Sequence, residues 1–289
     1  YLGNTISEIS AEKAGILRPG VPVVFVDKRP ESTQVLTECA AKAQSPAIMI
    51  GKNNISDVNI NHKTIDFSLY TGYYKYVNLS LSTAAPYQIE NASLAAAAAQ
   101  ALSDERITQS VIREGLRLAR WPGRMEEIRP GVYLDGAHNE DGIEAFLAAA
   151  ENTCREGRRL LLFGVVRDKR YEEMIRRIVR SGLFSQIAVS VPDSERGLSL
   201  EREREIWEQC RAELCAEESG QADPAPENGQ DGPKGFRAFT LGFYEDAHEA
   251  YEKLMAERGD EDVVYITGSL YLIGQMRTVV QKITTDGKQ

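Results

Sequence analysis

Residues 121–143, WPGRMEEIRPGVYLDGAHNEDGI, decide the fold of the second half of this chain. A Gly-Arg pair precedes a short apolar run, VYLD (132–135), and this predicted strand ends on an acid. The turn that follows, Gly136 to Asn139, leads directly into a helical run, GIEAFLAAA. Ligands of open α/β sheets lie at the carboxyl ends of strands, and a helix N-terminus attracts anions. Together with Arg124, whose guanidinium suits phosphate, the stretch predicts a site for a phosphorylated ligand and favours a nucleotide.

The sequence beyond this stretch alternates between strand and helix patterns. Such alternation predicts an α/β fold, Rossmann-like, with a mostly parallel sheet covered on both faces. Residues 219–235, SGQADPAPENGQDGPKG, are rich in Pro, Gly and polar residues and predict a flexible loop. The expected strands are 132–135, 159–166, 185–192, 236–242 and 262–268, and the expected helices are 142–155, 171–182, 201–218, 244–259 and 270–283.

The sequence before Trp121 has a different pattern. The Pro-Gly turn in WPGR predicts a boundary between domains at 1–122 and 123–289. Alternating polar and apolar residues between 52 and 83 predict hairpin-like strands with polar outer faces. The other expected elements are a buried strand at 22–27, a strand at 47–51, and helices at 3–17, 31–44, 87–102 and 107–119, the last after a cap at Thr108.

The composition argues against some classes of function but does not identify one. The chain has 289 residues, a formal net charge of −9 and a hydrophobic share of 42%. This acidic balance argues against a nucleic-acid partner, because binding a phosphate backbone needs a basic face. No apolar run approaches the roughly 20 residues of a membrane span. We therefore expect a soluble protein with no membrane partner.

Five blocks of the chain, in the right order, resemble one family. The blocks are LGNTISEISAEKAGILRPGVPVV (2–24), YQIENASLAAAA (87–98), GRMEE with LDGAHN (123–139), LLFGVVRDK (161–169) and ITGSLYLIG (266–274). Together they resemble the folylpolyglutamate synthases and dihydrofolate synthases of the Mur ligase superfamily. The resemblance implies that 1–122 is part of the central ATP-binding domain and 123–289 the glutamate-ligase domain.

The activity implied by this resemblance is an ATP-dependent and Mg²⁺-dependent ligation. A carboxylate of pteroate or of a folate glutamate is phosphorylated, and the amine of L-glutamate attacks the acyl phosphate to give an amide. A monomeric, cytoplasmic enzyme is expected. The family's ATP site begins with a P-loop, GxxxxGK[ST], and no such string occurs here. Because the first residue is Tyr1, we expect the loop to precede this chain, and the chain alone to be inactive.

The resemblance also assigns roles to single residues, each beside a structural alternative. Lys13 matches a carbamylated lysine that helps hold Mg²⁺; otherwise it is a solvated helix residue. Asn91 is expected to contact the nucleotide base or ribose, or to cap a helix. Arg124 is expected to reach ATP phosphate; otherwise it is a surface arginine after a turn. Asp135 is expected to bond ribose hydroxyls or to cap the following helix. His138 is expected near the γ-phosphate, where it stabilises phosphoryl charge or orients the acyl phosphate; otherwise it is a structural histidine.

Two further strand ends are expected to serve the amino-acid substrate. Asp168 and Lys169 follow the strand LLFGVV, and by resemblance this turn borders the active cleft. Ser269 heads the last predicted helix, where it serves as an N-cap, and the matching family serine lies near the incoming glutamate. Both roles of Ser269 are compatible, since a helix N-terminus also attracts a carboxylate.

Two other functions stay open at this point. One is a Mur-type ligase that acts on a cell-wall precursor, although the KAGI and GSLYLIG segments resemble the folate branch more closely. The other is a truncated, non-catalytic module that binds a nucleotide weakly. The absent P-loop string favours this second alternative for the chain as it stands.

Overall fold

The structure is a computed structural model that describes residues 3, 5–61, 63–72, 74–153, 156–220 and 239–286. The chain divides into two compact units, Tyr1–Arg120 and Trp121–Gln289. Each unit is considered by itself. None of the helices in the described ranges is both long and apolar enough to cross a membrane.

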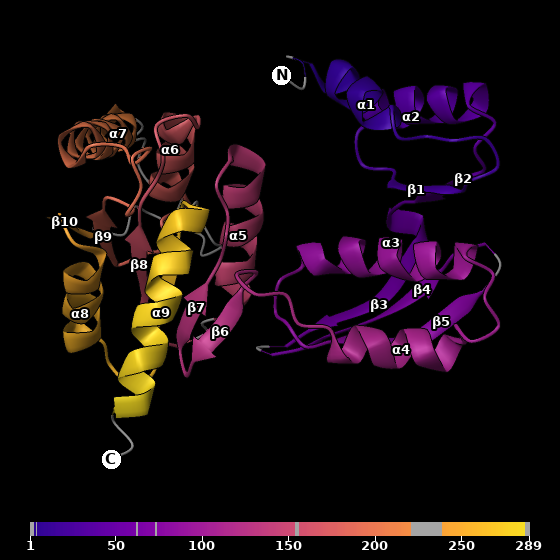
Figure 1. Ribbon diagram of the computed structural model, residues 1–289. Coiled ribbons are helices and arrows are strands. Elements are labelled where there is room, and N and C mark those ends of the chain that lie inside the picture. Colours follow the sequence, from indigo (N-terminus) through magenta and orange to yellow (C-terminus); the bar gives the residue numbers. More distant parts are fainter. Residues whose placement is uncertain are drawn as a thin grey trace, which may run out of the picture. The chain divides into compact units, whose positions relative to one another are not determined.

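The second unit is built on a six-stranded sheet with the order β10-β9-β8-β11-β7-β6 (Figure 1). The five strands from β10 to β7 run parallel, and β6 pairs antiparallel with β7 at the edge. This confirms the mostly parallel sheet expected from the alternating sequence. The strands are β6 (Glu126–Arg129), β7 (Val132–Leu134), β8 (Arg159–Phe163), β9 (Gln186–Ser190), β10 (Thr240–Tyr244) and β11 (Val263–Thr267).

Helices cover both faces of this sheet (Figure 1). On one face, side chains of β7 such as Val132 and Leu134 join a core with α8 and α9. Tyr133, between them, points to the other face and stacks on Tyr265 with ring centroids 5.8 Å apart. Because alternate side chains enter two apolar layers, the strands read as almost continuous hydrophobic runs. The helices are α5 (Glu140–Thr153), α6 (Tyr171–Ser181), α7 (Leu200–Gly220), α8 (Ala247–Glu257) and α9 (Leu270–Asp286).

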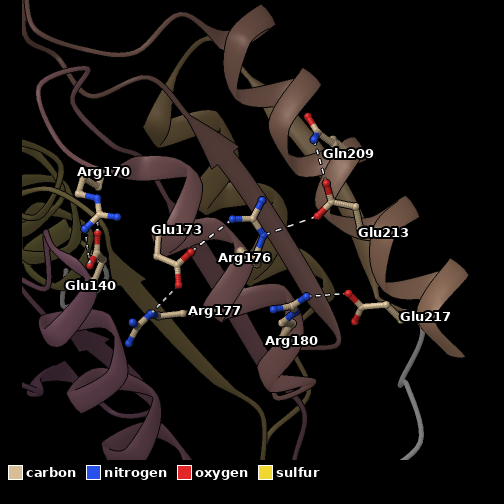
Figure 2. Close-up of polar contacts among 9 residues, drawn as sticks. All are labelled: Glu140, Arg170, Glu173, Arg176, Arg177, Arg180, Gln209, Glu213 and Glu217. Carbon is tan, nitrogen blue, oxygen red and sulfur yellow. Dashed lines mark hydrogen bonds and ion pairs between the residues drawn. The ribbon is translucent and has the colours of Figure 1, made fainter.

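Ion pairs connect helices α6 and α7 of the second unit. Figure 2 shows Arg176 and Arg180 of α6 reaching Glu213 and Glu217 of α7, at 3.6 and 2.7 Å. These pairs are partly or largely exposed, and such pairs contribute only about 0.2–1 kcal/mol each. They therefore align the helices, while the apolar layer beneath them supplies most of the stabilisation.

The first unit holds two smaller sheets. Strands β1 and β2 pair in parallel, while β3, β4 and β5 form an antiparallel sheet. Helix α1 begins with a capping box, in which Thr5 Oγ1 accepts from the Glu8 N–H and the Glu8 carboxylate accepts from the Thr5 N–H. The elements are α1 (Ile6–Ala14), β1 (Val23–Val26), α2 (Pro30–Lys42), β2 (Ala47–Ile50), η1 (Lys52–Asn54), β3 (Ile55–Ile60), β4 (Ile65–Tyr70), β5 (Lys75–Leu81), α3 (Tyr87–Ala101) and α4 (Gln109–Leu118).

The core of the first unit lies between the antiparallel sheet and the helices α3 and α4. Ile65, Phe67 and Leu69 of β4 pack with Ala96 and Ala97 of α3, and all five are nearly inaccessible to solvent. The hairpin strands expected between residues 52 and 83 are confirmed as three antiparallel strands. The small alanine side chains let α3 approach the sheet closely.

Several expectations are corrected by the structure. The edge strand β6 was not expected, because its sequence EEIR has no apolar alternation. Helix α1 is shorter than 3–17, and in β1 only Phe25 is buried, so 22–27 is not a fully buried strand. Residues 219 and 220 end α7, whereas the rest of the expected loop 219–235 lies outside the described residues.

Candidate functional site

Three loops meet at the carboxyl edge of the sheet in the second unit. They follow β7, β11 and β8, which are neighbours in the sheet. The Gly268 N–H donates to the Ala137 carbonyl at 3.1 Å, and the Gly164 N–H donates to the Thr267 carbonyl at 3.3 Å. Main-chain bonds therefore tie the three loops together, and they gather the candidate residues of this unit at one edge.

Asp135, at the end of β7, is buried, with 2% of its surface exposed. Its Oδ2 accepts from the Met125 N–H and its Oδ1 accepts from the Ala137 N–H, both at 2.9 Å. The helix-cap alternative for Asp135 is wrong. Asn139 caps α5 instead, because its Oδ1 accepts from the Gly142 N–H at 2.8 Å.

Arg124 lies in the turn that Asp135 holds. Its main-chain N–H donates to the Trp121 carbonyl at 3.2 Å, and its side chain is half-buried. Within the described parts of the chain, its guanidinium forms no ion pair. A guanidinium of this kind keeps its donors available for an anion such as phosphate.

His138 lies between the end of β7 and the start of α5 and is partly exposed. Its Nδ1 lies 2.8 Å from the Gly136 carbonyl oxygen. A carbonyl only accepts, so Nδ1 carries the proton of this bond and Nε2 is the remaining nitrogen. The ring is thus oriented by the main chain, with Nε2 able to accept a proton or, when protonated, to donate to an oxyanion.

Asp168 and Lys169 lie in the loop after β8. The Asp168 carboxylate forms an ion pair with Arg196, a residue of the loop after β9 that the sequence did not single out. Next in the chain, Arg170 pairs with Glu140 at 2.9 Å, as Figure 2 shows. Because Glu140 opens α5, this pair links the loop of Asp168 to the turn of His138.

Ser269 is almost fully buried at the start of α9. Its Oγ accepts from the Tyr271 N–H at 3.1 Å, which confirms the expected helix cap. The hydroxyl proton of Ser269 stays available to another acceptor. With α5 and α9, two helix N-termini open at the same edge, and each favours negative charge there.

Lys13 and Asn91 belong to the first unit. Lys13 lies exposed in the last turn of α1. Asn91 does not cap a helix, because α3 begins four residues earlier at Tyr87. Its side-chain amide is exposed and donates to the Gln88 side chain at 2.9 Å. Among the described residues no group of His, Cys, Asp or Glu side chains is arranged to hold a metal ion.

A buried carboxyl lies close to the loop after β8. Glu203, in the first turns of α7, has no exposed surface. Neither of its oxygens, nor the indole nitrogen of Trp207 one turn later, has a hydrogen-bond partner in the described structure. Burial raises the pKa of Glu203 well above its usual value, and the nearby N–H groups of Val165 and Trp207 offset only part of this rise.

Comparison with known proteins shows which family this chain resembles. Residues 123–270, just over half of the chain, match the Mur ligase, glutamate ligase domain. The dihydrofolate synthase/folylpolyglutamate synthase of Bacillus subtilis is 29% identical over 285 residues. That match covers 96% of this chain and 58% of the relative, so this chain spans less than two thirds of the relative's length.

Two solved structures that are similar to this chain are folylpolyglutamate synthases. The folylpolyglutamate synthase of Thermotoga maritima matches with a TM-score of 0.71 and 26% identity, over 96% of this chain and 58% of that one. A Mycobacterium tuberculosis folylpolyglutamate synthase complexed with ADP matches with a TM-score of 0.76, over 96% and 60% of the two chains. At 21% identity, this second likeness shows the fold alone. With its matching domain and its parallel sheet, the chain belongs to the Mur ligase family.

Proposed function

We propose that this chain serves an ATP-dependent ligase that adds L-glutamate to a folate or to dihydropteroate. The observation that carries the proposal is the half-buried guanidinium of Arg124, which has no ion-pair partner among the described residues, at an edge where two helix N-termini open. Such an edge favours a polyanion. The names of the relatives, which are folate glutamate ligases, support the choice of substrate.

The proposed nucleotide contacts come from three residues. Arg124 binds phosphate, and Asn91 contacts the base or ribose through its exposed amide. Asp135 follows β7 at this edge of the sheet, and we assign its carboxylate to the ribose hydroxyls. In its buried position, the carboxylate also holds the Arg124 turn.

The proposed chemistry has two steps. The γ-phosphoryl group passes from ATP to the folate carboxylate, which gives an acyl phosphate and ADP. The glutamate amine then attacks the carbonyl carbon, phosphate leaves, and the amide nitrogen loses a proton. When His138 Nε2 also carries a proton, it donates to the transferred phosphoryl group and stabilises its charge, and no covalent protein intermediate is needed.

We assign the glutamate contacts to residues of the loops after β8 and β11. The Ser269 hydroxyl and the Lys169 ammonium suit a carboxylate, and the Asp168 carboxylate suits the ammonium of the amino acid. Mg²⁺ stays a proposed cofactor together with ATP, and Lys13 its proposed carbamylated ligand. The described residues do not compose a Mg²⁺ site by themselves, so no step is derived through the ion. The cytoplasmic location and monomeric state expected from the family stay predictions.

Steady-state kinetics of a ligase-competent protein that contains this chain test the proposal. We expect His138→Ala to lower kcat by roughly 10²–10³, because its contact strengthens as phosphoryl charge develops. We expect Asp135→Ala to raise the KM for ATP instead, since a ribose contact is made equally in the ground state. His248→Ala, an exposed histidine on α8, is the control. A kcat of His138→Ala within a few-fold of wild type would make this histidine structural.

A further inference from the structure

The turn that carries Arg124 has an unusual backbone. Gly123 and Met125, on either side of Arg124, have φ angles of +69° and +45°. For an L-residue such as Met125, the left-handed region costs roughly 1–2 kcal/mol. The direction of the Arg124 side chain therefore depends on contacts that hold both neighbours in this conformation.

Two carboxylates supply these contacts. The Met125 N–H donates to Asp135 at 2.9 Å, and the Gly123 N–H donates to Glu126 Oε2 at 2.6 Å. The Glu126 carboxylate also forms an ion pair with the Arg277 guanidinium of α9, in which Nη1 lies 3.0 Å from Oε1 and Nη2 contacts Oε2. Both side chains of this pair are more than two-thirds buried.

One face of α9 packs against the same turn. A Cβ atom on Gly123 would lie 2.7 Å from Ile273 Cδ1, and one on Gly136 would lie 2.8 Å from Leu270 Cδ2. Arg277 follows Ile273 by four residues and so lies on the same helix face. Apolar contact and an ion pair from one helix face therefore fix the turn together.

The charges of this arrangement bear on Arg124, whose guanidinium has no ion-pair partner in the part of the chain that the structure describes. Glu126 lies only two residues from Arg124, and a free carboxylate there would compete with phosphate for the guanidinium. Arg277 occupies both oxygens of Glu126. It thereby cancels a negative charge beside the phosphate position and leaves Arg124 available.

We propose that Glu126 and Arg277 are positioning residues that hold the Arg124 turn in the shape that binds nucleotide phosphate. The inference rests on the proposed phosphate role of Arg124. It predicts an effect confined to ligands that carry phosphate, which a general loss of stability would not produce.

The test compares the affinities of ADP and adenosine for the full chain, by calorimetry or NMR titration. We expect Arg277→Leu to weaken ADP binding by about tenfold, a change typical of coupled contacts, and adenosine binding by less than twofold. Arg277→Lys should restore part of the loss. The control is Arg176→Leu, an arginine of similar exposure that pairs with α7 away from the turn; it should change neither affinity.

A double-mutant cycle separates the positioning role of Arg277 from the phosphate-binding role of Arg124. In an Arg124→Ala background, Arg277→Leu should have no further effect on ADP affinity. An effect that persists there, or an equal loss for ADP and adenosine, overturns the positioning role. If Arg124→Ala alone leaves ADP affinity unchanged, the proposed phosphate role fails, and the inference fails with it.

Amide hydrogen exchange gives a readout that needs no nucleotide. Glu126→Ala should accelerate exchange of the Gly123 amide at least tenfold, since its hydrogen bond is lost, while the Ala137 amide, bonded to Asp135, stays protected. Unchanged exchange at Gly123 in a folded Glu126→Ala variant would overturn the inference whatever the nucleotide data show.

Discussion

The two units contain parallel strands of almost the same chemistry, VVFV in β1 and VVYIT in β11, but with different environments. Every residue of β11 is buried, because strands flank it on both sides and helices cover both faces. In β1 only Phe25 is buried, and nearby apolar side chains such as Ile16 and Met49 are 81% and 46% exposed. The neighbours of an apolar strand, and not its sequence alone, therefore decide how far its side chains are buried.

Limited proteolysis would show the largest difference between the units. The second unit has a core on both faces of its sheet, whereas the described residues of the first unit form a parallel sheet of β1 and β2. Cleavage follows the free energy of local opening, so we expect early cuts in residues 1–120 and a protected product that begins near Trp121. A protected product confined to residues 1–120 would contradict this view.

Matched core truncations measure the same difference in free energy. Phe146, on α5, is fully buried and contacts the rings of Phe184 and Tyr265. We expect Phe146→Ala to lower the free energy of unfolding of the second unit by about 3–5 kcal/mol. Phe25→Ala should cost the first unit less, roughly 1–3 kcal/mol, because its half-exposed surroundings relax or hydrate more easily. Denaturant unfolding of both variants measures these free energies. Equal losses of unfolding free energy would contradict the expected difference between the two units.

The sequence predicted the second unit better than the first. Strand and helix alternation identified its five parallel strands. Four of them, β7, β8, β9 and β11, are almost entirely buried and read as apolar runs. The alternation missed β6, whose charged residues pair at an edge. The alternative that Asn91 caps a helix is wrong, because α3 begins after Pro86, a residue with no capping side chain. The partners Arg196 and Arg277 could not be found, since they meet Asp168 and Glu126 only through the fold.

A smaller effect concerns Glu203 in the core of the second unit. Its folded-state pKa is raised by burial, so the folded state keeps a proton that the unfolded chain releases above its ordinary pKa of 4.5. Stability therefore falls as the pH rises above that value, and Glu203→Gln removes this loss. Unfolding at pH 5 and pH 8 should show that the advantage of the Gln variant grows with pH. An advantage that shrinks or stays constant would mean that Glu203 is ionised in the folded protein.

The most direct test of the central claim is an NMR titration of the chain with ADP and with adenosine. We expect ADP to shift the amides of Gly123 to Met125, Gly136 to Asn139 and Gly268 to Leu270 more strongly than adenosine does, and we expect this phosphate-dependent excess to be lost in Arg124→Ala. Equal shifts of these amides with ADP and with adenosine, or a phosphate-dependent excess that survives Arg124→Ala, would contradict a phosphate site at the carboxyl edge of this sheet.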